Sequence, residues 1–530
     1  RFHPMRRLTG LSTRLALTST AAALLALAGC SSIDTAGGYH DGSNLSAEDD
    51  AGDQPGDTGY DEEPSLDDTG DEEPPPAPTP SPPQEGADPP VEPICGDGHD
   101  SIEFIAGAGD ALSVPAIVRA AVLDEGDDLP NVPISRRPFL NYYRLAPSAP
   151  DVDTLQVNAD LWEIEKGPDD QFRLQLSIST KELDAESRPV MHAILVADAT
   201  IRSQGSRLEI ARAAIEAVGS ALRPGDHLSL IVVGEQAEVV LEHHAIDGPE
   251  DATLLATIAE LDAAGDSSLD EGLALAHALS AEHQDGQSPN RIVLLSGGGI
   301  SLSAQTLTDL GVLAEVNHGQ GSDVVAVGLG PLEGYDDELI ASVAAAGHGP
   351  ALFVGNEDDA WNLLGGQFSS HMLTAARDVE VEVVLPAGLA TPEPGEDEGG
   401  QFPYSPAPVR LGYADTLVFH QHVDPCDTLA DDAEIAVTVR WRDGALGEEH
   451  EQQFLLPMSA LSDAEQPTHV HKAAAIVAYA DALGALQQGR TDATTVLFHA
   501  QAMIESAIEY LPDDPELFEM ADILQQLSAR

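Results

Sequence analysis

Basic residues are scarce in this sequence: 24 Lys and Arg stand against 91 Asp and Glu, which gives a formal charge of −67. Nucleic acids and anionic lipid surfaces attract proteins through Lys and Arg, so this balance excludes an electrostatic footprint for either. We therefore expect no nucleic-acid partner. The acidity suits a solvated surface outside the cytoplasm, and basic proteins or cations as ligands.

Sequence motifs for common catalytic chemistry are also missing. There is no Walker A loop and no GxGxxG after a predicted strand. Ser296 precedes a glycine run, but the nucleophile-elbow motif needs Gly two residues before the serine, and Leu294 stands there. No His/Asp partner set accompanies it, so we expect a non-catalytic protein.

The N-terminus has the pattern of a secretory signal. Arginines precede an apolar run at 15–28, which is too short to span a bilayer as a mature helix and ends in small residues. The run ends in Leu27-Ala28-Gly29-Cys30, which resembles the lipobox of bacterial lipoproteins. The resemblance implies cleavage before Cys30 and a lipid anchor on that residue, so residues 1–30 are predicted to be a lipoprotein signal peptide. By the sorting rule of such lipoproteins, Ser31 implies the outer membrane.

Residues 31–94 lack any means of forming a core. Up to residue 93 the segment has no Lys or Arg, and acidic and proline runs such as DEEPPP dominate it. It cannot bury enough apolar surface to offset the entropy of ordering. We predict an extended acidic tether that holds the folded part away from the membrane.

Cysteine is rare, with three residues in the chain. No CxxC pair occurs, which argues against the usual structural zinc site. With Cys30 assigned to lipid, Cys95 and Cys426 remain in a compartment where disulfides persist. They are a candidate disulfide, worth about 4 kcal/mol or more from loop closure. Two free thiols are the alternative.

The folded region begins with an N-terminal segment at 95–150, in which 116–123 follows Pro115 with a helical pattern. A β segment at 151–185 follows. Its stretches 155–165 and 172–180 alternate apolar and polar residues around Gly167-Pro168-Asp169-Asp170, which predicts a hairpin.

Residues 186–376 change to strands that alternate with helices. The buried run 194–196 is followed by a helix at 206–222, with Ser206 and Glu209 in the pattern of a capping box. Further strands are expected at 228–233, 237–241, 292–295, 324–327 and 351–354, and further helices at 252–261, 268–280, 304–316, 337–345 and 359–368. This order predicts an α/β fold: a doubly wound, mostly parallel sheet covered by helices on both faces.

The order of strand, DATIR loop, helix, LRPGDHLSLIVVG, AAGDSSLDEGLALAHAL, NRIVLLSGGG and VVAVGLG resembles a von Willebrand factor type A domain. More narrowly, it resembles the bacterial lipoproteins of that class, in which phrases like FLNYY and ARDVEVEV flank the domain. The resemblance implies a metal-ion-dependent adhesion site. In the family, an Asp-x-Ser-x-Ser loop, a Thr and a second Asp hold Mg²⁺ at the carboxyl ends of the strands.

The family site is only partly kept in this chain. Asp198 matches its first aspartate, and Thr200 replaces the first serine and keeps a hydroxyl. Arg202 stands at the second serine and Ser268, or its neighbour 267, at the threonine, whereas Gly297 replaces the second aspartate. One anionic ligand is thus lost and one cation added.

The electrostatic repulsion at this site then indicates whether it can bind a metal ion. A guanidinium about 4 Å from a divalent cation, at an effective dielectric near 20, repels it by roughly 8 kcal/mol. We hypothesise that Arg202 pairs with Asp198 and replaces the charge of the metal, which makes a metal-free pseudo-site. The alternative is that Arg202 turns to solvent on a simple surface loop.

Beyond the α/β domain the period returns to two. Residues 377–459 are predicted to be a β region, in which 435–441 pairs with 453–457. Because β segments lie on both sides of the α/β domain, we predict that the domain is inserted in one β-sandwich. Residues 460–530 contain three helical stretches, at 470–486, 493–510 and 515–527, expected to form a C-terminal cap or else a partner-binding bundle.

The sequence therefore predicts a lipid-anchored, non-catalytic lipoprotein of the cell envelope. It would bind an envelope or extracellular protein through the top of the α/β sheet, without a metal or other cofactor. The alternative is a Mg²⁺-dependent adhesion module, in which Asp198, Thr200 and Ser268 bind the ion. The missing ligand would then come from the partner or from a nearby acid such as Asp266 or Asp270.

Overall fold

The computed structural model describes residues 101–530, with gaps at 105–111, 144, 146–154, 164–171, 185, 267, 286–287, 299–301, 319–321, 391–408, 426–429, 431–432, 445–446 and 459–467. The predicted signal peptide, the tether and the candidate cysteines Cys30, Cys95 and Cys426 lie outside the described residues.

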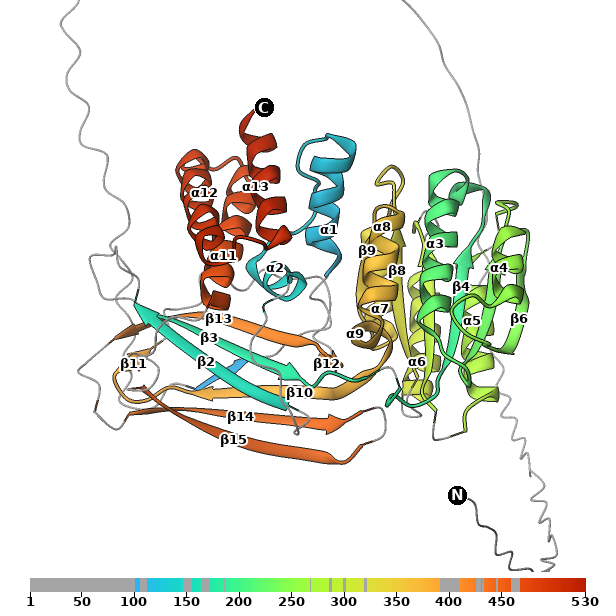
Figure 1. Ribbon diagram of the computed structural model, residues 1–530, viewed down its shortest axis with the longest axis horizontal. Coiled ribbons are helices and arrows are strands. Elements are labelled where there is room, and N and C mark those ends of the chain that lie inside the picture. Colours follow the sequence, from blue (N-terminus) through green and yellow to red (C-terminus); the bar gives the residue numbers. More distant parts are fainter. Residues whose placement is uncertain are drawn as a thin grey trace, which may run out of the picture. The chain divides into compact units, whose positions relative to one another are not determined.

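A six-stranded sheet is the centre of the α/β domain, with the strand order β6-β5-β4-β7-β8-β9 (Figure 1). The edge strand β6 is antiparallel to β5, and the other pairs are parallel. The strands are β4 (His192–Asp198), β5 (His227–Val233), β6 (Ala237–Ala245), β7 (Asn290–Ser296), β8 (Asp323–Leu329) and β9 (Ala351–Val354). The predicted doubly wound α/β fold is confirmed.

Helices cover both faces of this sheet, and β4 shows how. Its residues Ala193 and Leu195 pack into one core with α3 and α4, while Ile194 and Val196 pack into a second core with α5, α6 and α7. A strand buried on both faces has one continuous apolar run in its sequence, and this run is the reason why β4 was predicted to be a central strand. The helices are α3 (Ser206–Ala221), α4 (Ala252–Ala259), α5 (Leu269–Glu282), α6 (Ala304–His318), α7 (Asp337–Ala346), α8 (Glu357–Ala360) and α9 (Phe368–Met372), with a π-helical turn η3 (Trp361–Gly366) between the last two.

The start of α3 differs from the prediction. Gly205 is the N-cap, with φ of 86°, and no side chain caps the helix there. Ser206 is already inside the first turn, so the predicted capping box with Glu209 is wrong. Glycine at 205 provides the left-handed backbone that turns the chain sharply out of the loop after β4.

Two antiparallel sheets share one further core. One has the order β1-β10-β14-β15 with β12 paired to β10, and the other has the order β11-β13-β3-β2. The strands are β1 (Ser101–Phe104), β2 (Leu155–Glu163), β3 (Phe172–Thr180), β10 (Thr374–Val384), β11 (Leu389–Ala390), β12 (Val409–Gly412), β13 (Thr416–Pro425), β14 (Glu434–Asp443) and β15 (Glu449–Pro457). Strands before the α/β domain pair with strands after it, β3 with β13 and β1 with β10, so the domain is an insertion between them.

The C-terminal helices α11 (Thr468–Gln487), α12 (Ala493–Tyr510) and α13 (Pro515–Ser528) share a core with the N-terminal segment. That segment forms α1 (Ser113–Arg119), which continues into a π-helical turn η1 (Ala120–Glu125), and α2 (Arg136–Tyr142). In α2, Asn141 bonds both backbone groups of Val418 on β13, at 2.8 and 3.3 Å. Because they share this core, the C-terminal helices form a cap over the N-terminal segment.

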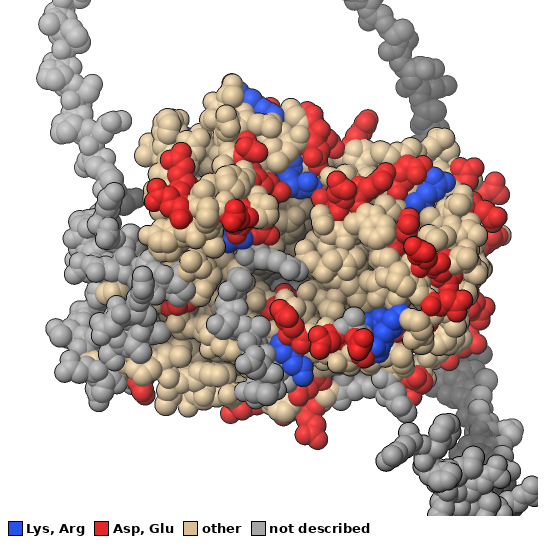
Figure 2. All heavy atoms as spheres, in the orientation of Figure 1, with Lys and Arg blue, Asp and Glu red and all other residues tan. Residues whose placement is uncertain are grey.

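On the visible face, acidic side chains outnumber basic ones (Figure 2). Among the described helices, none has the length and apolar character needed to cross a bilayer.

Candidate functional site

The site predicted from the sequence lies where β4 ends. Asp198 is the last residue of β4, which has β5 and β7 as parallel neighbours on its two sides. Asp198 and Thr200 are buried, with exposed fractions of 2% and 0%. The carboxylate therefore sits at the bottom of the loops that follow the central strands, where open α/β sheets bind ligands.

Three donors hold the Asp198 carboxylate. Its Oδ1 accepts hydrogen bonds from the backbone N–H of Thr200 at 3.1 Å and from the Thr200 hydroxyl at 2.8 Å. Its Oδ2 accepts from the hydroxyl of Ser296, the last residue of β7, at 2.7 Å. The Ser296 oxygen in turn accepts from the Gly298 N–H at 3.0 Å. The carboxylate is satisfied by protein groups alone.

Arg202 lies elsewhere, and the predicted pairing of Arg202 with Asp198 is wrong. A 3₁₀ turn over Ile201–Ser203 directs the side chain outward, where 42% of it is exposed. Its guanidinium donates to the Asp266 carboxylate at 3.1 Å. Because both partners are exposed, this ion pair contributes little to stability.

Arg207, in the first turn of α3, is the cation that enters the site. Its guanidinium donates to the backbone carbonyls of Leu329 at 3.1 Å, Pro331 at 2.7 Å and Glu333 at 2.9 Å. A fourth bond goes to the carbonyl of Arg202 at 3.2 Å. These bonds fix the side chain, which is 8% exposed, between the start of α3 and the loop after β8.

The guanidinium lies against Gly297. A Cβ added at this glycine would overlap Nε and Cδ of Arg207. Burial lowers the pKa of Arg207, while the nearby carboxylates of Asp198 and Glu333 act in the opposite direction. The group stays charged, because the pKa of an arginine starts above 12. A fixed positive charge thus stands where the family pattern places its second carboxylate.

Ser268 is not part of this network. It is the N-cap residue of α5, and its hydroxyl donates to the Asp270 carboxylate in the first turn of the same helix. Of the residues predicted for the site, the structure brings Asp198, Thr200 and Gly297 together. Ser268 and Arg202 face other partners, and Ser296 and Arg207 are the participants that the sequence analysis missed.

Comparison with known proteins agrees with this arrangement of strands and loops. Residues 194–299 match the family described as von Willebrand factor type A domain. The chain contains a von Willebrand factor type A domain.

Relatives of known sequence or structure are distant. An uncharacterised protein of Synechocystis is 22% identical over 236 residues, which are 43% of this chain and 54% of that protein, so the chain spans about half of its length. The structure is similar to a von Willebrand factor type A protein from Catenulispora acidiphila, at 14% identity and a TM-score of 0.42, over 67% of this chain and 87% of that one. It is also similar to VWA2, the ArnB paralogue of Sulfolobus acidocaldarius, at 14% identity and a TM-score of 0.37, over 71% and 98%.

The residues at the top of this type A domain do not fit Mg²⁺. Mg²⁺ requires oxygen ligands in near-octahedral geometry. Here both oxygens of Asp198 accept hydrogen bonds from protein donors, and Gly297 supplies no second carboxylate. The two acids that could replace it are engaged, Asp266 with Arg202 and Asp270 with Ser268. The Arg207 guanidinium offers donors only.

Proposed function

We propose that this chain is a non-catalytic lipoprotein of the cell envelope that binds another protein through its type A domain, without a metal ion. The observation that carries the proposal is the buried Arg207 guanidinium beside Gly297. A permanent internal cation provides the positive charge that a bound metal provides in a complete adhesion site. The rim of the domain is then preformed and independent of divalent ions.

The rim offers a compact contact surface. Ile201 is 51% exposed and lies beside the exposed ion pair of Arg202 and Asp266. An apolar side chain surrounded by charged groups is a common composition for a protein contact. We propose that Ile201 is the apolar centre of this contact and that Arg202 and Asp266 determine its orientation.

The envelope location is proposed from the sequence alone. A charged and apolar leader ends in Leu-Ala-Gly-Cys, and a long acidic tether follows Cys30. A lipid on Cys30 would anchor the chain to a membrane, and the tether would extend the type A domain toward its partner.

Affinity capture tests whether the chain binds a partner protein and whether this binding requires a divalent metal ion. The full chain is used as bait in detergent-solubilised envelopes, with and without EDTA, beside an Ile201→Asp variant. We expect a partner that is retained in EDTA and lost with Ile201→Asp. Val240→Asp is the matched control, because Val240 is a 41% exposed apolar residue on β6.

Calorimetric titration with Mg²⁺ and Mn²⁺ completes the test. Micromolar binding that Asp198→Ala abolishes, or a partner released by EDTA, would overturn the proposal and favour the Mg²⁺-dependent adhesion module. Equal capture by wild type and Ile201→Asp would show that the contact lies elsewhere.

A further inference from the structure

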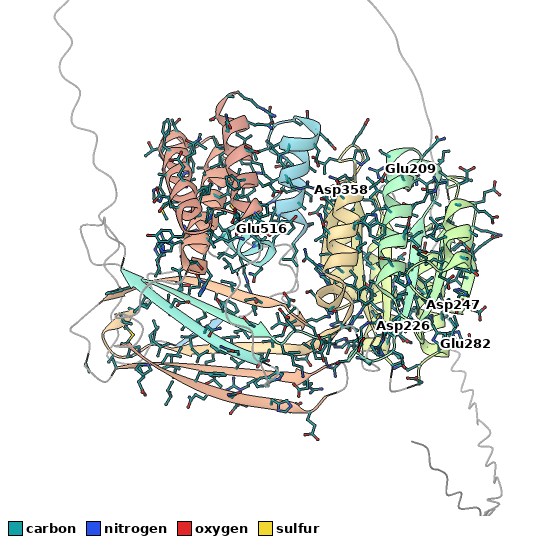
Figure 3. The ribbon with its side chains drawn as sticks, viewed as in Figure 1. Glu209, Asp226, Asp247, Glu282, Asp358 and Glu516 are labelled. Atoms are coloured by element: carbon teal, nitrogen blue, oxygen red, sulfur yellow. The ribbon has the colours of Figure 1, made fainter. Side chains whose placement is uncertain are left out.

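Four histidine rings gather at the end of the type A domain opposite to the pseudo-site. The ring centroids are 3.9 Å apart for His227 and His243, 4.1 Å for His243 and His283, and 4.8 Å for His192 and His243. His192 and His227 open the neighbouring strands β4 and β5 in register with each other. Figure 3 shows Glu282, beside this group, far from Glu209 in the first turn of α3.

A β-bulge places two of the side chains. In the β5–β6 pairing the register shifts between Leu228↔His244 and Leu230↔Leu241, so both Glu242 and His243 lie opposite Ser229. The Ser229 hydroxyl oxygen accepts from the His243 N–H at 2.9 Å and lies 2.8 Å from His192 Nε2. His243 adopts φ of 43°, a conformation uncommon outside glycine. Bulges of this kind redirect side chains and are frequent beside functional sites.

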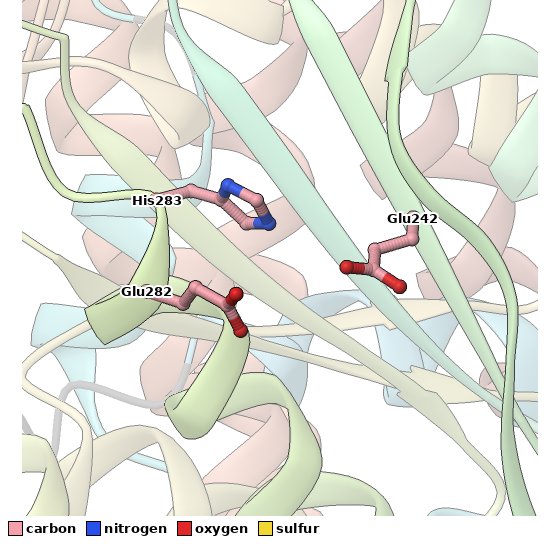
Figure 4. Close-up of side chains that lie close together, drawn as sticks. All are labelled: Glu242, Glu282 and His283. Carbon is pink, nitrogen blue, oxygen red and sulfur yellow. The ribbon is translucent and has the colours of Figure 1, made fainter.

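The C-terminal end of α5 completes the group. Glu282 is the last residue of α5 and His283 follows it as the C-cap. Ligand atoms of Glu242, Glu282 and His283 lie within 4.8 Å of one another, and Figure 4 shows the three side chains facing a common space.

Two ring nitrogens at this position are shielded from solvent without a hydrogen-bond partner among the described residues: Nε2 of His283 and Nδ1 of His192. His192 is 3% exposed. A buried imidazole nitrogen without a hydrogen-bond partner loses free energy, and a cation would recover it.

We propose that Glu242, Glu282 and His283 bind one divalent transition-metal cation, with zinc as the best match. Zinc takes imidazole nitrogen and carboxylate oxygen at about 2.0 to 2.2 Å and commonly leaves a fourth position for water. Ligand atoms around such an ion lie about 3.4 Å apart. The site therefore closes by a shift of roughly 1 Å in two exposed glutamates, which long side chains make readily.

The ligand set separates this site from a simple acidic surface. Two carboxylates balance the charge of a divalent ion, while the imidazole favours zinc, copper or nickel over magnesium and calcium. The rings of His192 and His243 lie against the ring of His283, at centroid distances of 5.4 and 4.1 Å, and limit its movement. The pseudo-site at the other end of the sheet has no part in this, so the proposal is independent of the proposed function.

Metal binding would join the edge strand β6 to α5. An ion that binds only the folded state raises the melting temperature in proportion to the logarithm of its concentration. Because β6 is an edge strand with one paired neighbour in the described sheet, it gains most from such a link.

The test is a calorimetric titration of the EDTA-stripped full chain with ZnCl₂ in detergent, together with melting curves. We expect one tight equivalent of Zn²⁺, at least tenfold tighter than the background from other acidic and histidine residues, and a melting temperature raised by several degrees. Both effects are lost in Glu242→Gln/Glu282→Gln and in His283→Asn. Mg²⁺ at the same concentrations leaves both readouts unchanged.

Matched controls are Glu238→Gln/Glu260→Gln and His499→Asn, which change the same residue types at exposed positions elsewhere. They should keep the tight equivalent. Circular dichroism in EDTA verifies that each variant is folded, since none of the altered ligands belongs to a core. Equal zinc affinity in the wild type and both ligand variants, or no tight equivalent in the wild type, would overturn the proposal.

Discussion

The guanidinium of Arg207 fills the space that any side chain at Gly297 would need. The two positions are therefore coupled: an aspartate at 297 and an arginine in this conformation at 207 cannot both be accommodated without movement. The site therefore holds a cation where the family pattern places a carboxylate, and Asp198 has this cation as a positive neighbour.

Restoring the carboxylate alone should not restore a magnesium site. In Gly297→Asp the new side chain must displace the guanidinium and would form an ion pair with it. In the triple variant Gly297→Asp/Arg207→Leu/Arg202→Ser, a second carboxylate is gained and both nearby cations are removed. We expect Mg²⁺ and Mn²⁺ binding with a submillimolar dissociation constant in the triple variant, measured by calorimetry, and none in the single variant.

The matched control adds Asp198→Ala to the triple variant, and binding should vanish. If Gly297→Asp alone binds Mg²⁺ as tightly as the triple variant, Arg207 does not determine the metal-free state.

The sequence predicted three of the five residues described at this site, for a physical reason. Asp198 ends one buried strand, and Thr200 and Gly297 come directly after buried strands, so strand order determines where they lie. Arg202 is in the loop itself and was the obvious cation by position, but a 3₁₀ turn directs it outward. The direction of Arg207 depends on how α3 starts at Gly205, which helical periodicity does not reveal.

The fold was more predictable than the site because long periodic segments report burial directly. The central strands, α3 and the three C-terminal helices lie close to their predicted ranges. Helix α2 was missed, since its seven residues include two arginines and Pro138 and show no clear stripe. It exists through packing: Phe139 and Leu140 enter the core shared with the C-terminal helices.

Asp323 should be essential for the junction between the type A domain and the β-sandwich. Arg291 is 0% exposed and donates to Asp323 at 2.6 Å, to the Thr374 hydroxyl at 3.0 Å and to the Met372 carbonyl at 3.0 Å. Asp323→Asn leaves a buried guanidinium without its counter-charge. We expect a loss of about 3 to 5 kcal/mol in the free energy of unfolding, measured in urea.

Asp309→Asn is the control for Asp323, because it removes one exposed carboxylate from α6. It should change stability by less than about 0.5 kcal/mol. A loss below about 1 kcal/mol in Asp323→Asn would mean that the junction does not depend on this ion pair.

Asp251 should stabilise α4 in a pH-dependent way. Its carboxylate caps the helix by accepting from the N–H groups of Thr253 at 3.0 Å and Leu254 at 2.9 Å. Burial alone would raise its pKa, but hydrogen bonds from Leu254, Asp247 and His244 lower it to about 2. Its stabilising effect is thus complete above the ordinary pKa of 3.8 and is lost as the pH falls toward 2.

We expect Asp251→Ala to cost about 1 to 2 kcal/mol at pH 7, measured by urea unfolding, and progressively less below pH 4. Asp247→Ala, which removes an exposed carboxylate from the same loop, should have little effect. A cost that stays constant down to pH 2 would contradict the role of the ionised cap.

Glu519 on α13 should have the opposite pH dependence. It lines a cavity of about 1020 Å³ together with Arg119 and Tyr142. Burial raises its pKa from 4.5 to about 6, although Arg119 and a hydrogen bond from the Tyr143 hydroxyl act against the shift. The folded state therefore binds more protons than the unfolded state between these values. Stability contributed by this group is complete below pH 4.5 and is lost as the pH rises through 6.

A shift of this size corresponds to about 2 kcal/mol. Glu519→Gln keeps the shape of the side chain and removes its charge, so we expect it to stabilise the helical cap by roughly that amount at pH 8 and by almost nothing at pH 4. The measurement is urea unfolding followed by circular dichroism at both pH values. Glu505→Gln, at an exposed position on α12, corrects for the general loss of one negative charge. If the two variants gain the same stability at pH 8, the gain comes from the lower net charge of the chain and not from the burial of Glu519.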